Sequence, residues 1–532
     1  LLNVHAHQEP WLMRQVDKCY RPVLDPVLKA PKRALIPAGI ALVLGVLGYF
    51  NVGKSFMPTM DEGDILVQLT KSPAISLQHS IELDLAVERA IKAHVPEVEH
   101  IVARAGSDEL GLDPMGLNET DMFLQLKPKA QWRKSDKAWL ADELRKVLTG
   151  FPGIDTGLTQ PIEMRISEML TGSRGDLAIK LFGPDLHTLG SLAQQTASVL
   201  EGVRGAQDVL TQTTEGVDYL QVVIDPIAAG RNGLAVADVQ DELRAQIDGM
   251  PAGTVLEPNR RTPILVRGGD DIRMSELRFK QLRIALPAGG EIPLAVIASL
   301  KAGSGPVKVG REQGSRFALV QANVDGRDLV GFVEDAKAAV AKAVLLPPGY
   351  HMEWGGQFEN QQRAAKRLGL VIPLALAAIF LVLFMTFGSL RQASLILCNI
   401  PFALVGGILA LWASGQYLSV PASVGFIALL GIAVLNGLVL VTCFNQLHDT
   451  GLPMAEVVRR GALARVRPVL MTASITALGL VPLLLASGPG SEIQKPLAIV
   501  VIGGLLTSTA LTLLLLPILF QRYGIPPEQE AA

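Results

Sequence analysis

The sequence predicts an α+β membrane protein with about six transmembrane helices and a large domain outside the membrane. The chain is 49% apolar and only 18% charged, and its mean hydropathy is +0.34. Its long uncharged runs have the ~20 residues that cross the hydrocarbon core of a bilayer. Between the first two runs, from Ile65 to about Leu368, strand patterns alternate with helix patterns.

The N-terminal segment is basic, and lysine and arginine before an apolar run mark the cytoplasmic side. The spacing of Trp11, Leu12, Val16 and Tyr20 predicts an amphipathic helix on the membrane surface, or alternatively an ordinary linker helix. The chain opens without an initiator Met or a signal-peptide pattern. We therefore interpret it as the later part of a longer protein, either a fragment or a natural half-length gene product.

These patterns divide the chain into five segments. The short basic loops fall on one side of the spans, which places both chain ends in the cytoplasm and the large domain outside it. A net charge of -2 gives no reason to expect nucleic acid as a partner. The expected segments are a cytoplasmic N-terminal segment (1–33), a transmembrane helix (34–53), an extracytoplasmic domain (54–366), a five-helix transmembrane bundle (367–520) and a cytoplasmic tail (521–532).

The alternation in the soluble region predicts small split βαβ units in series. The stretch 252–302 has a weaker helix pattern and predicts a β-rich insertion between two units. The expected strands are 65–69, 100–104, 122–126, 177–182, 209–211, 219–224, 317–324 and 350–354. The expected helices are 77–93, 138–148, 186–200, 236–247 and 329–344.

The remaining apolar runs are 368–387, 393–413, 421–444, 469–485 and 496–520. The run 421–444 carries small residues along its length and one carboxamide, Asn436, near its middle. A polar side chain at that depth is costly unless it faces other helices or a water-filled path. Asn436 therefore marks either a packing contact or a functional interior.

Residues 48–55, Gly-Tyr-Phe-Asn-Val-Gly-Lys-Ser, match the pattern of a phosphate-binding loop. Such a loop works only between a buried strand and the N-terminus of a helix. Here it follows a membrane-length run and precedes a segment broken by Pro and Gly, so we expect no phosphate site. The chain also lacks H-E-x-x-H, G-x-S-x-G and paired C-x-x-C motifs, and we expect neither an enzyme nor a bound cofactor.

Five segments stand out in order along essentially the whole chain. They are Phe-Met-Pro-Thr-Met-Asp-Glu-Gly-Asp (56–64), Trp-Gly-Gly-Gln-Phe-Glu (354–359), Pro-Phe-Ala-Leu-Val-Gly-Gly (401–407), Gly-Ile-Ala-Val-Leu-Asn-Gly (431–437) and Arg-Val-Arg-Pro-Val-Leu-Met-Thr (465–472). In these segments the chain resembles resistance-nodulation-division (RND) efflux pumps. The resemblance covers the C-terminal half of such a pump, from its seventh to its twelfth span. Val-Leu-Asn-Gly at 434–437 and the segment 487–498 look most like the heavy-metal efflux branch of the cobalt-zinc-cadmium type.

The resemblance implies a homotrimeric, proton-driven permease of the bacterial inner membrane, embedded in lipid. Its large periplasmic domain would comprise ferredoxin-like porter units and a docking insertion. A periplasmic adaptor and an outer-membrane channel would be its partners, and heavy-metal cations, with Zn, Co, Cd or Ni favoured, its substrates. The alternatives are a drug-exporting RND permease, which the low aromatic content of 5% does not favour, and a non-transporting half-pump scaffold.

Proton coupling in this family depends on paired acids in the fourth span, which this chain lacks. Drug-exporting relatives also carry a Lys in the tenth span, where this sequence has Leu435 beside Asn436. Arg465 and Thr472 match polar positions at the start of the eleventh span. We therefore expect Asn436, Arg465 and Thr472 to support the proton relay, or alternatively to be polar packing residues.

Ligand type indicates the metal, because thioethers suit Cu(I) whereas carboxylate and imidazole suit Zn and its neighbours. Relatives that export monovalent metals use three methionines, and the matching positions here hold Gln68, Glu168 and Leu234. We therefore predict a divalent substrate. Glu163, Glu168 and Met169 are the predicted substrate path, with Glu163 and Glu168 as metal ligands; the alternative is a solvated helix face. The histidines of the soluble region lack metal-ligand spacing and are predicted to be surface residues, namely His79, His94, His100, His187 and His351.

Overall fold

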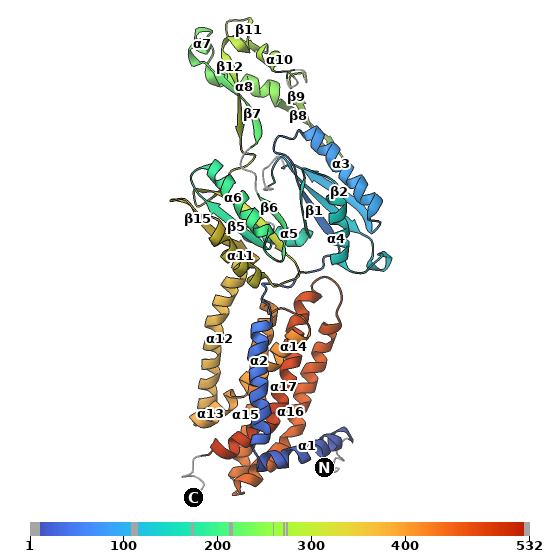
Figure 1. Cartoon of the computed structure of the whole chain (residues 1–532), viewed down its shortest axis with the longest axis vertical. Coiled ribbons are helices and arrows are strands. Elements are labelled where there is room, and N and C mark those ends of the chain that lie inside the picture. The colour runs from blue at the N-terminus through green and yellow to red at the C-terminus, as the bar shows by residue number, and fades with distance from the viewer. Residues whose placement is uncertain are drawn as a thin grey trace. The chain divides into compact units, whose positions relative to one another are not determined.

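The computed structural model describes residues 11–107, 115–171, 175–211, 216–258, 260–269, 272 and 275–525 (Figure 1). Within them, contacts divide the chain into two compact units. The first comprises 1–71, 77–212 and 309–532, and the second comprises 72–76 and 213–308.

Six helices of the described chain are long and apolar enough to cross a membrane, as the apolar runs predicted. The run 393–413 is split into two helices, because a new helix begins at Ile400 with Pro401 in its first turn. Proline suits that position, since it has no N–H to donate to a preceding turn. The membrane helices are α2 (Lys32–Asn51), α12 (Gln357–Phe387), α13 (Leu390–Leu397) with α14 (Ile400–Ala413), α15 (Val420–His448), α16 (Met454–Leu485) and α17 (Ser491–Tyr523).

Small residues allow the membrane helices to approach closely. Helix α17 packs against α14, α15 and α16 (Figure 1). A Cβ atom at Gly503 of α17 would lie 2.8 Å from the carbonyl oxygen of Gly406 and 2.3 Å from Cβ of Ala410. The α14–α17 contact therefore depends on glycine, as is common between membrane helices.

The amphipathic pattern near the N-terminus forms α1 (Trp11–Lys29). Its apolar residues Leu24 and Val27 are buried. The Tyr20 hydroxyl donates to the carbonyl of Leu513 (2.6 Å), and Asp25 pairs with Arg459 of α16 (2.9 Å). One face of α1 is thus packed on the helical bundle.

The soluble part of the first unit contains two sheets with the antiparallel strand order of a ferredoxin-like fold. The first sheet has the order β2-β3-β1-β4, and in the second β6, β14, β5 and β15 are neighbours in that order, with the short β13 also pairing with β14. The first ferredoxin-like unit comprises β1 (Ile65–Thr70), α3 (Leu77–His94), β2 (Val98–Ala105), β3 (Glu119–Leu126), α4 (Lys137–Leu148) and β4 (Asp155–Thr159). The second comprises β5 (Leu177–Phe182), α6 (Leu186–Glu201), β6 (Ala206–Thr211), β13 (Gly310–Glu312), β14 (Ser315–Val324), α11 (Leu329–Ala343) and β15 (His351–Gly356). Helix α5 (Pro161–Thr171) connects them in the chain.

The second compact unit interrupts the second ferredoxin-like unit between β6 and β13. It is larger than the predicted insertion of 252–302, because the expected strand 219–224 and helix 236–247 also belong to it. Its apolar core contains residues from before the predicted insertion, such as Leu243, and residues from within it, such as Ile297. Its elements are β7 (Val217–Ile224), α7 (Pro226–Arg231), α8 (Val236–Ile247), β8 (Met250–Glu257), β9 (Arg260–Val266), α10 (Glu276–Lys280), β10 (Arg283–Ala285), β11 (Glu291–Pro293) and β12 (Ala298–Gly305).

The phosphate-loop pattern does not form a phosphate loop. Gly48 lies inside α2, which continues to Asn51. The next element after Ser55 is the strand β1 rather than a helix. Lys54 instead forms an isolated bridge with Leu418, ahead of α15. The backbone N–H groups of this segment are therefore not arranged around an anion.

Candidate functional site

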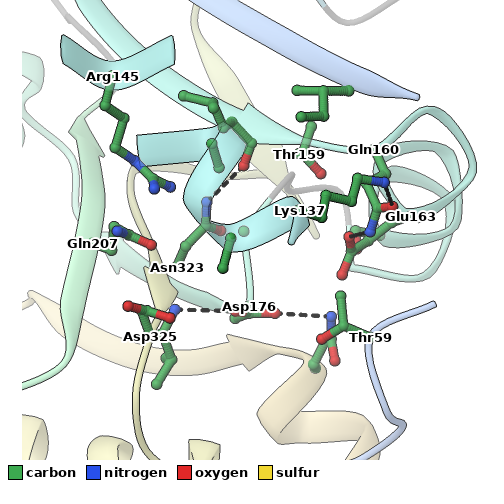
Figure 2. A pocket seen from close by; sticks show the side chains of 18 residues that line it. Thr59, Lys137, Arg145, Thr159, Gln160, Glu163, Asp176, Gln207, Asn323 and Asp325 are labelled. Carbon is green, nitrogen blue, oxygen red and sulfur yellow. Dashed lines mark hydrogen bonds between the residues drawn. The ribbon is translucent and has the colours of Figure 1, made fainter. Parts of the chain in front are cut away.

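A cavity of about 350 Å³ lies in the first unit, lined from both ferredoxin-like units and from α5 (Figure 2). Acidic, basic and amide side chains line its walls, and no described aromatic side chain does. In Figure 2, Lys137, Gln160 and Glu163 gather on one side, and Arg145, Gln207 and Asn323 lie on the other. The polar lining residues are Thr59, Lys137, Arg145, Thr159, Gln160, Glu163, Ser167, Asp176, Gln207, Asn323, Asp325 and Gln357.

The start of α5 places Glu163 at this cavity. Pro161 is the first residue of the helix, where the missing N–H costs nothing. The carboxylate of Glu62 accepts hydrogen bonds from the backbone N–H groups of Ile162 (2.6 Å) and Glu163 (2.7 Å). A carboxylate at this end of a helix is favoured by the helix dipole. Glu62 therefore holds the first turn of α5, and with it Glu163.

Gln160 orients the Glu163 side chain. Its Nε2 donates to Glu163 Oε2 (3.2 Å) and to the carbonyl of Met60 (2.7 Å). Its Oε1 accepts from the backbone N–H of Glu62 (3.0 Å) and from Nζ of Lys137. These four partners leave one orientation for the buried amide.

Two carboxyl groups of the cavity are poised to hold protons near neutral pH. Burial raises the pKa of Glu163 to about 7, helped by the negative charges of Asp176 and Glu62 and opposed by Gln160 and Lys137. Burial also raises the pKa of Asp176 to about 6, although the N–H of Val324 stabilises its charged form through a 3.0 Å hydrogen bond. Burial disfavours the charged form because a carboxylate loses its hydration.

Asp61, close to this site, behaves in the opposite way. Partial burial alone would raise its pKa, but hydrogen bonds from Lys129 and Lys137 lower it to about 2. Nζ of Lys137 lies 2.9 Å from Asp61 Oδ1. Asp61 is therefore a fixed anion that neutralises lysines, whereas Glu163 and Asp176 are available to a cation.

A second cavity, of about 60 Å³, adjoins the same helix. It shares Thr59, Glu163, Ser167 and Gln357 with the larger cavity. Its other lining residues are Phe56, Met57, Pro58, Met60, Ile166 and Asn360. Glu163 is thus the carboxylate at the junction of the two cavities.

The predicted path residues on α5 do not all meet at this junction. Glu168 lines neither cavity, its side chain is 8% exposed, and Arg165 lies 3.5 Å from it. Glu163 and Glu168 are five positions apart, which places them on different faces of a helix. The side chain of Met169 lies outside the described residues.

The positions matched to the methionines of monovalent-metal relatives are not among the residues that line either cavity. Gln68 is buried on β1, and Leu234 belongs to the apolar core of the second unit. Over the described part of the chain, no three His, Cys, Asp or Glu side chains form a group able to hold a metal ion. The candidate site is thus lined by three carboxylates (Glu163, Asp176 and Asp325) and several amides, which do not form a complete ligand set.

In the membrane, the structure brings two of the three predicted relay residues together. The Thr472 hydroxyl donates to Asn436 Oδ1 (3.3 Å), and Asn436 is 3% exposed. Its Nδ2 atom has no hydrogen-bond partner among the described residues. Arg465 lies about two turns before Thr472 on α16 and is half-buried.

Several polar residues escaped the sequence reasoning. Asp176 had only a weak signal, a polar residue immediately before a buried strand. Gln160 and Lys137 had none, because their roles arise from contacts with a distant segment. In the bundle, Asn399 donates to Thr512 Oγ1 and also contacts the carbonyl of Ala433 (3.4 Å), a polar pair that the apolar runs concealed.

Comparison with known proteins gives one consistent result. The AcrB/AcrD/AcrF family profile matches residues 5–523. The chain is 42% identical to the cation efflux system protein CzcA of Alcaligenes sp. (strain CT14), over 97% of this chain and 49% of that protein. It is 40% identical to the nickel and cobalt resistance protein CnrA of Cupriavidus metallidurans, over 99% of this chain and 50% of that protein.

A solved structure agrees with these relatives. The crystal structure of a heavy metal efflux pump (crystal form II) superposes with a TM-score of 0.84 at 36% identity, over 96% of this chain and 52% of that one. The chain thus spans about half the length of the relatives it matches. Because the family match covers nearly the whole chain, the protein belongs to the AcrB/AcrD/AcrF family of RND transporters, as the sequence resemblance predicted, and is similar to its heavy-metal efflux members.

Proposed function

We propose that this chain is half of a proton-driven pump that exports heavy-metal cations, with Zn²⁺, Co²⁺, Cd²⁺ or Ni²⁺ as substrate. The observation that carries the proposal is Glu163, a carboxylate at the junction of two cavities in the soluble region. The names of the relatives CzcA, a cation efflux protein, and CnrA, a nickel and cobalt resistance protein, support the substrate class.

The chemistry of the cavity suits such a cation. Carboxylate and amide oxygens are ligands for these divalent metals, whereas Cu(I) prefers thiolate and thioether sulfur. Glu163 and Asp176 supply the charge, and Gln160 and Gln357 lie beside them as amides. A site without a complete ligand set binds less tightly than a closed structural site, which allows a transported ion to leave again.

Membership of the family supports our proposals for the other parts of the pump. Glu168 and Met169 extend the proposed path along α5, and Asn436, Arg465 and Thr472 support the proton relay in the bundle. We place the protein in the bacterial inner membrane as a homotrimer, with the soluble domain in the periplasm bound to an adaptor and an outer-membrane channel. We also propose the limits of the five segments that the sequence predicts, from the cytoplasmic N-terminal segment to the cytoplasmic tail.

A drug-exporting pump is the less favoured alternative, because drug pockets are lined mainly by hydrophobic and aromatic side chains. The described residues that line the larger cavity include no Phe, Tyr or Trp. A transport measurement distinguishes the third possibility, a scaffold that transports nothing, from both kinds of pump.

The test is metal accumulation in cells that lack the gene and are complemented with the complete gene or its variants. Wild type should lower cellular zinc, cobalt, cadmium or nickel, and Glu163→Gln should abolish most of that effect at equal protein level. Glu201→Gln, an exposed glutamate at the end of α6, is the matched control and should behave as wild type. Equal metal content with and without the gene would refute the proposal. Glu168→Gln in the same assay decides whether Glu168 belongs to the path.

A further inference from the structure

Residues 53–64, which we term the strap, connect α2 to β1 and contact several other parts of the first unit. Apart from one isolated bridge at Lys54, the strap has no helix or strand of its own. Its hydrogen bonds instead go to the start of α15, to α11, to β3 and α4, and to the start of α5.

At its membrane end the strap is bound to the start of α15. The N–H of Leu418 donates to the carbonyl of Gly53 (2.8 Å), and the N–H of Ser55 donates back to Leu418 (3.2 Å). The N–H of Val420, the first residue of α15, donates to the carbonyl of Phe56 (3.1 Å). Helix α15 is the one that carries Asn436.

The same end is bound to the second ferredoxin-like unit. The N–H of Lys54 donates to the carboxylate of Asp328 (3.1 Å), and the N–H of Val330 donates to the carbonyl of Lys54 (3.3 Å). A Cβ atom at Gly53 would lie 2.5 Å from Cβ of Asp328 and 2.9 Å from the Tyr417 ring. The contact is therefore close, with no room for a side chain on the strap.

At its far end the strap builds the surroundings of Glu163. The carbonyl of Met60 and the N–H of Glu62 bind the Gln160 amide, and the Glu62 carboxylate holds the first turn of α5. Asp61 holds Lys137, which in turn donates to Gln160. Both the position of Glu163 and the hydrogen bond to its carboxylate thus depend on residues 60–62.

Only three residues separate the two ends. Phe56 is the last one bound to α15, Met60 is the first one bound to Gln160, and Pro58 lies between them. The proline ring fixes one backbone dihedral of this short link, which makes it stiff. A displacement of the start of α15 should therefore displace residues 60–62 as well, because the short link between them cannot absorb much of the movement.

We infer that the strap couples α15 to the cation site, so that movement of this membrane helix changes how Gln160 and Glu62 hold Glu163. The inference rests on the proposed function, which makes Glu163 a cation ligand and α15 part of the proton relay. Glu62 and Gln160 are then positioning residues, and the link at 57–59 is the element that transmits the change.

The test inserts two glycines between Met57 and Pro58 in the complete gene product. This insertion leaves the bonded residues of both ends in place but adds slack between them. Zn²⁺ binding to the purified protein is measured by calorimetry, and Zn²⁺ transport is measured in proteoliposomes under a pH gradient. The Kd should stay at the wild-type value, and transport should fall by about tenfold, the scale of a coupling between two sites.

Two further variants complete the test. Pro58→Gly softens the link at unchanged length and should lower transport by a larger factor than it changes the Kd. The same two glycines between Gly289 and Gly290, in an exposed turn of the second unit, should leave both quantities unchanged.

Wild-type transport by both strap variants would overturn the inference. Loss of Zn²⁺ binding together with transport would also overturn it, because the strap would then only build the site. If wild type itself neither binds nor moves Zn²⁺, Co²⁺, Cd²⁺ or Ni²⁺, the proposed function fails and the inference falls with it.

Discussion

Glu163→Gln should stabilise the metal-free protein, and more so at higher pH. The folded protein raises the pKa of Glu163 from its ordinary value of 4.5 to about 7. Because the folded state binds this proton more tightly, the resulting stability is present below pH 4.5 and is lost as pH rises through 7. Gln resembles the protonated acid in shape and has no proton to lose. At 1.36 kcal/mol per pKa unit, its advantage over Glu grows by about 2.5 kcal/mol between pH 5 and pH 8.

The assay is urea unfolding of the detergent-purified protein in the presence of a chelator, at pH 5, 6.5 and 8. Unfolding is followed by tryptophan fluorescence, to which Trp132 in the core of the first sheet contributes. Glu201→Gln serves as the control and should follow wild type at every pH. If the difference between Glu163→Gln and wild type is the same at pH 5 and pH 8, Glu163 is not the raised carboxyl and the electrostatic reasoning is wrong.

Three further predictions concern packing and pairing. Arg145 lies 3.2 Å from the buried carboxylate of Asp208, so Arg145→Met should lower the free energy of unfolding by about 3 kcal/mol in urea titrations, and a loss under 1 kcal/mol would contradict a buried pair. In Gly503→Val the new side chain would clash with α14, so this variant should give no folded peak on size-exclusion chromatography after extraction from the membrane. Gly431 has open space around it, so Gly431→Val should give the wild-type peak. Thr472→Val deletes the hydroxyl that is hydrogen-bonded to the carboxamide of α15 and should reduce proton-driven metal transport without reducing protein level; unchanged transport would leave this pair a packing contact.

Local patterns located many of the elements, although the strand Asp155–Thr159 and most elements of the second unit were not among those expected. The strand Leu177–Phe182 and the helix Val236–Ile247 have the limits that periodicity predicted, and each apolar run overlaps one of the six long helices, some of which begin well before it. Context also sufficed to reject the phosphate loop. These features are readable because side-chain period and apolar length are properties of consecutive residues.

The sequence was a poorer guide to which structural unit each element belongs to. The helix Val236–Ile247 was correctly located but belongs to the insertion rather than to a ferredoxin-like unit. Periodicity reports which face of a helix is apolar but not which sheet it covers. The strand order of both ferredoxin-like sheets likewise comes from pairings between strands that are distant in sequence, such as β1 with β4.

The sequence by itself determined that this protein is a membrane-embedded member of the RND class, which runs are long and apolar enough to cross a membrane, and that Glu163 is a candidate site residue. Only the tertiary structure separated Glu163 from Glu168 and set Asp176 and Gln160 beside it. It also bound Gln160 to Met60, a hundred residues earlier in the chain. The physical reason is that burial, charge and hydrogen bonding at Glu163 come from the strap and both ferredoxin-like units, and these meet only when the chain is folded.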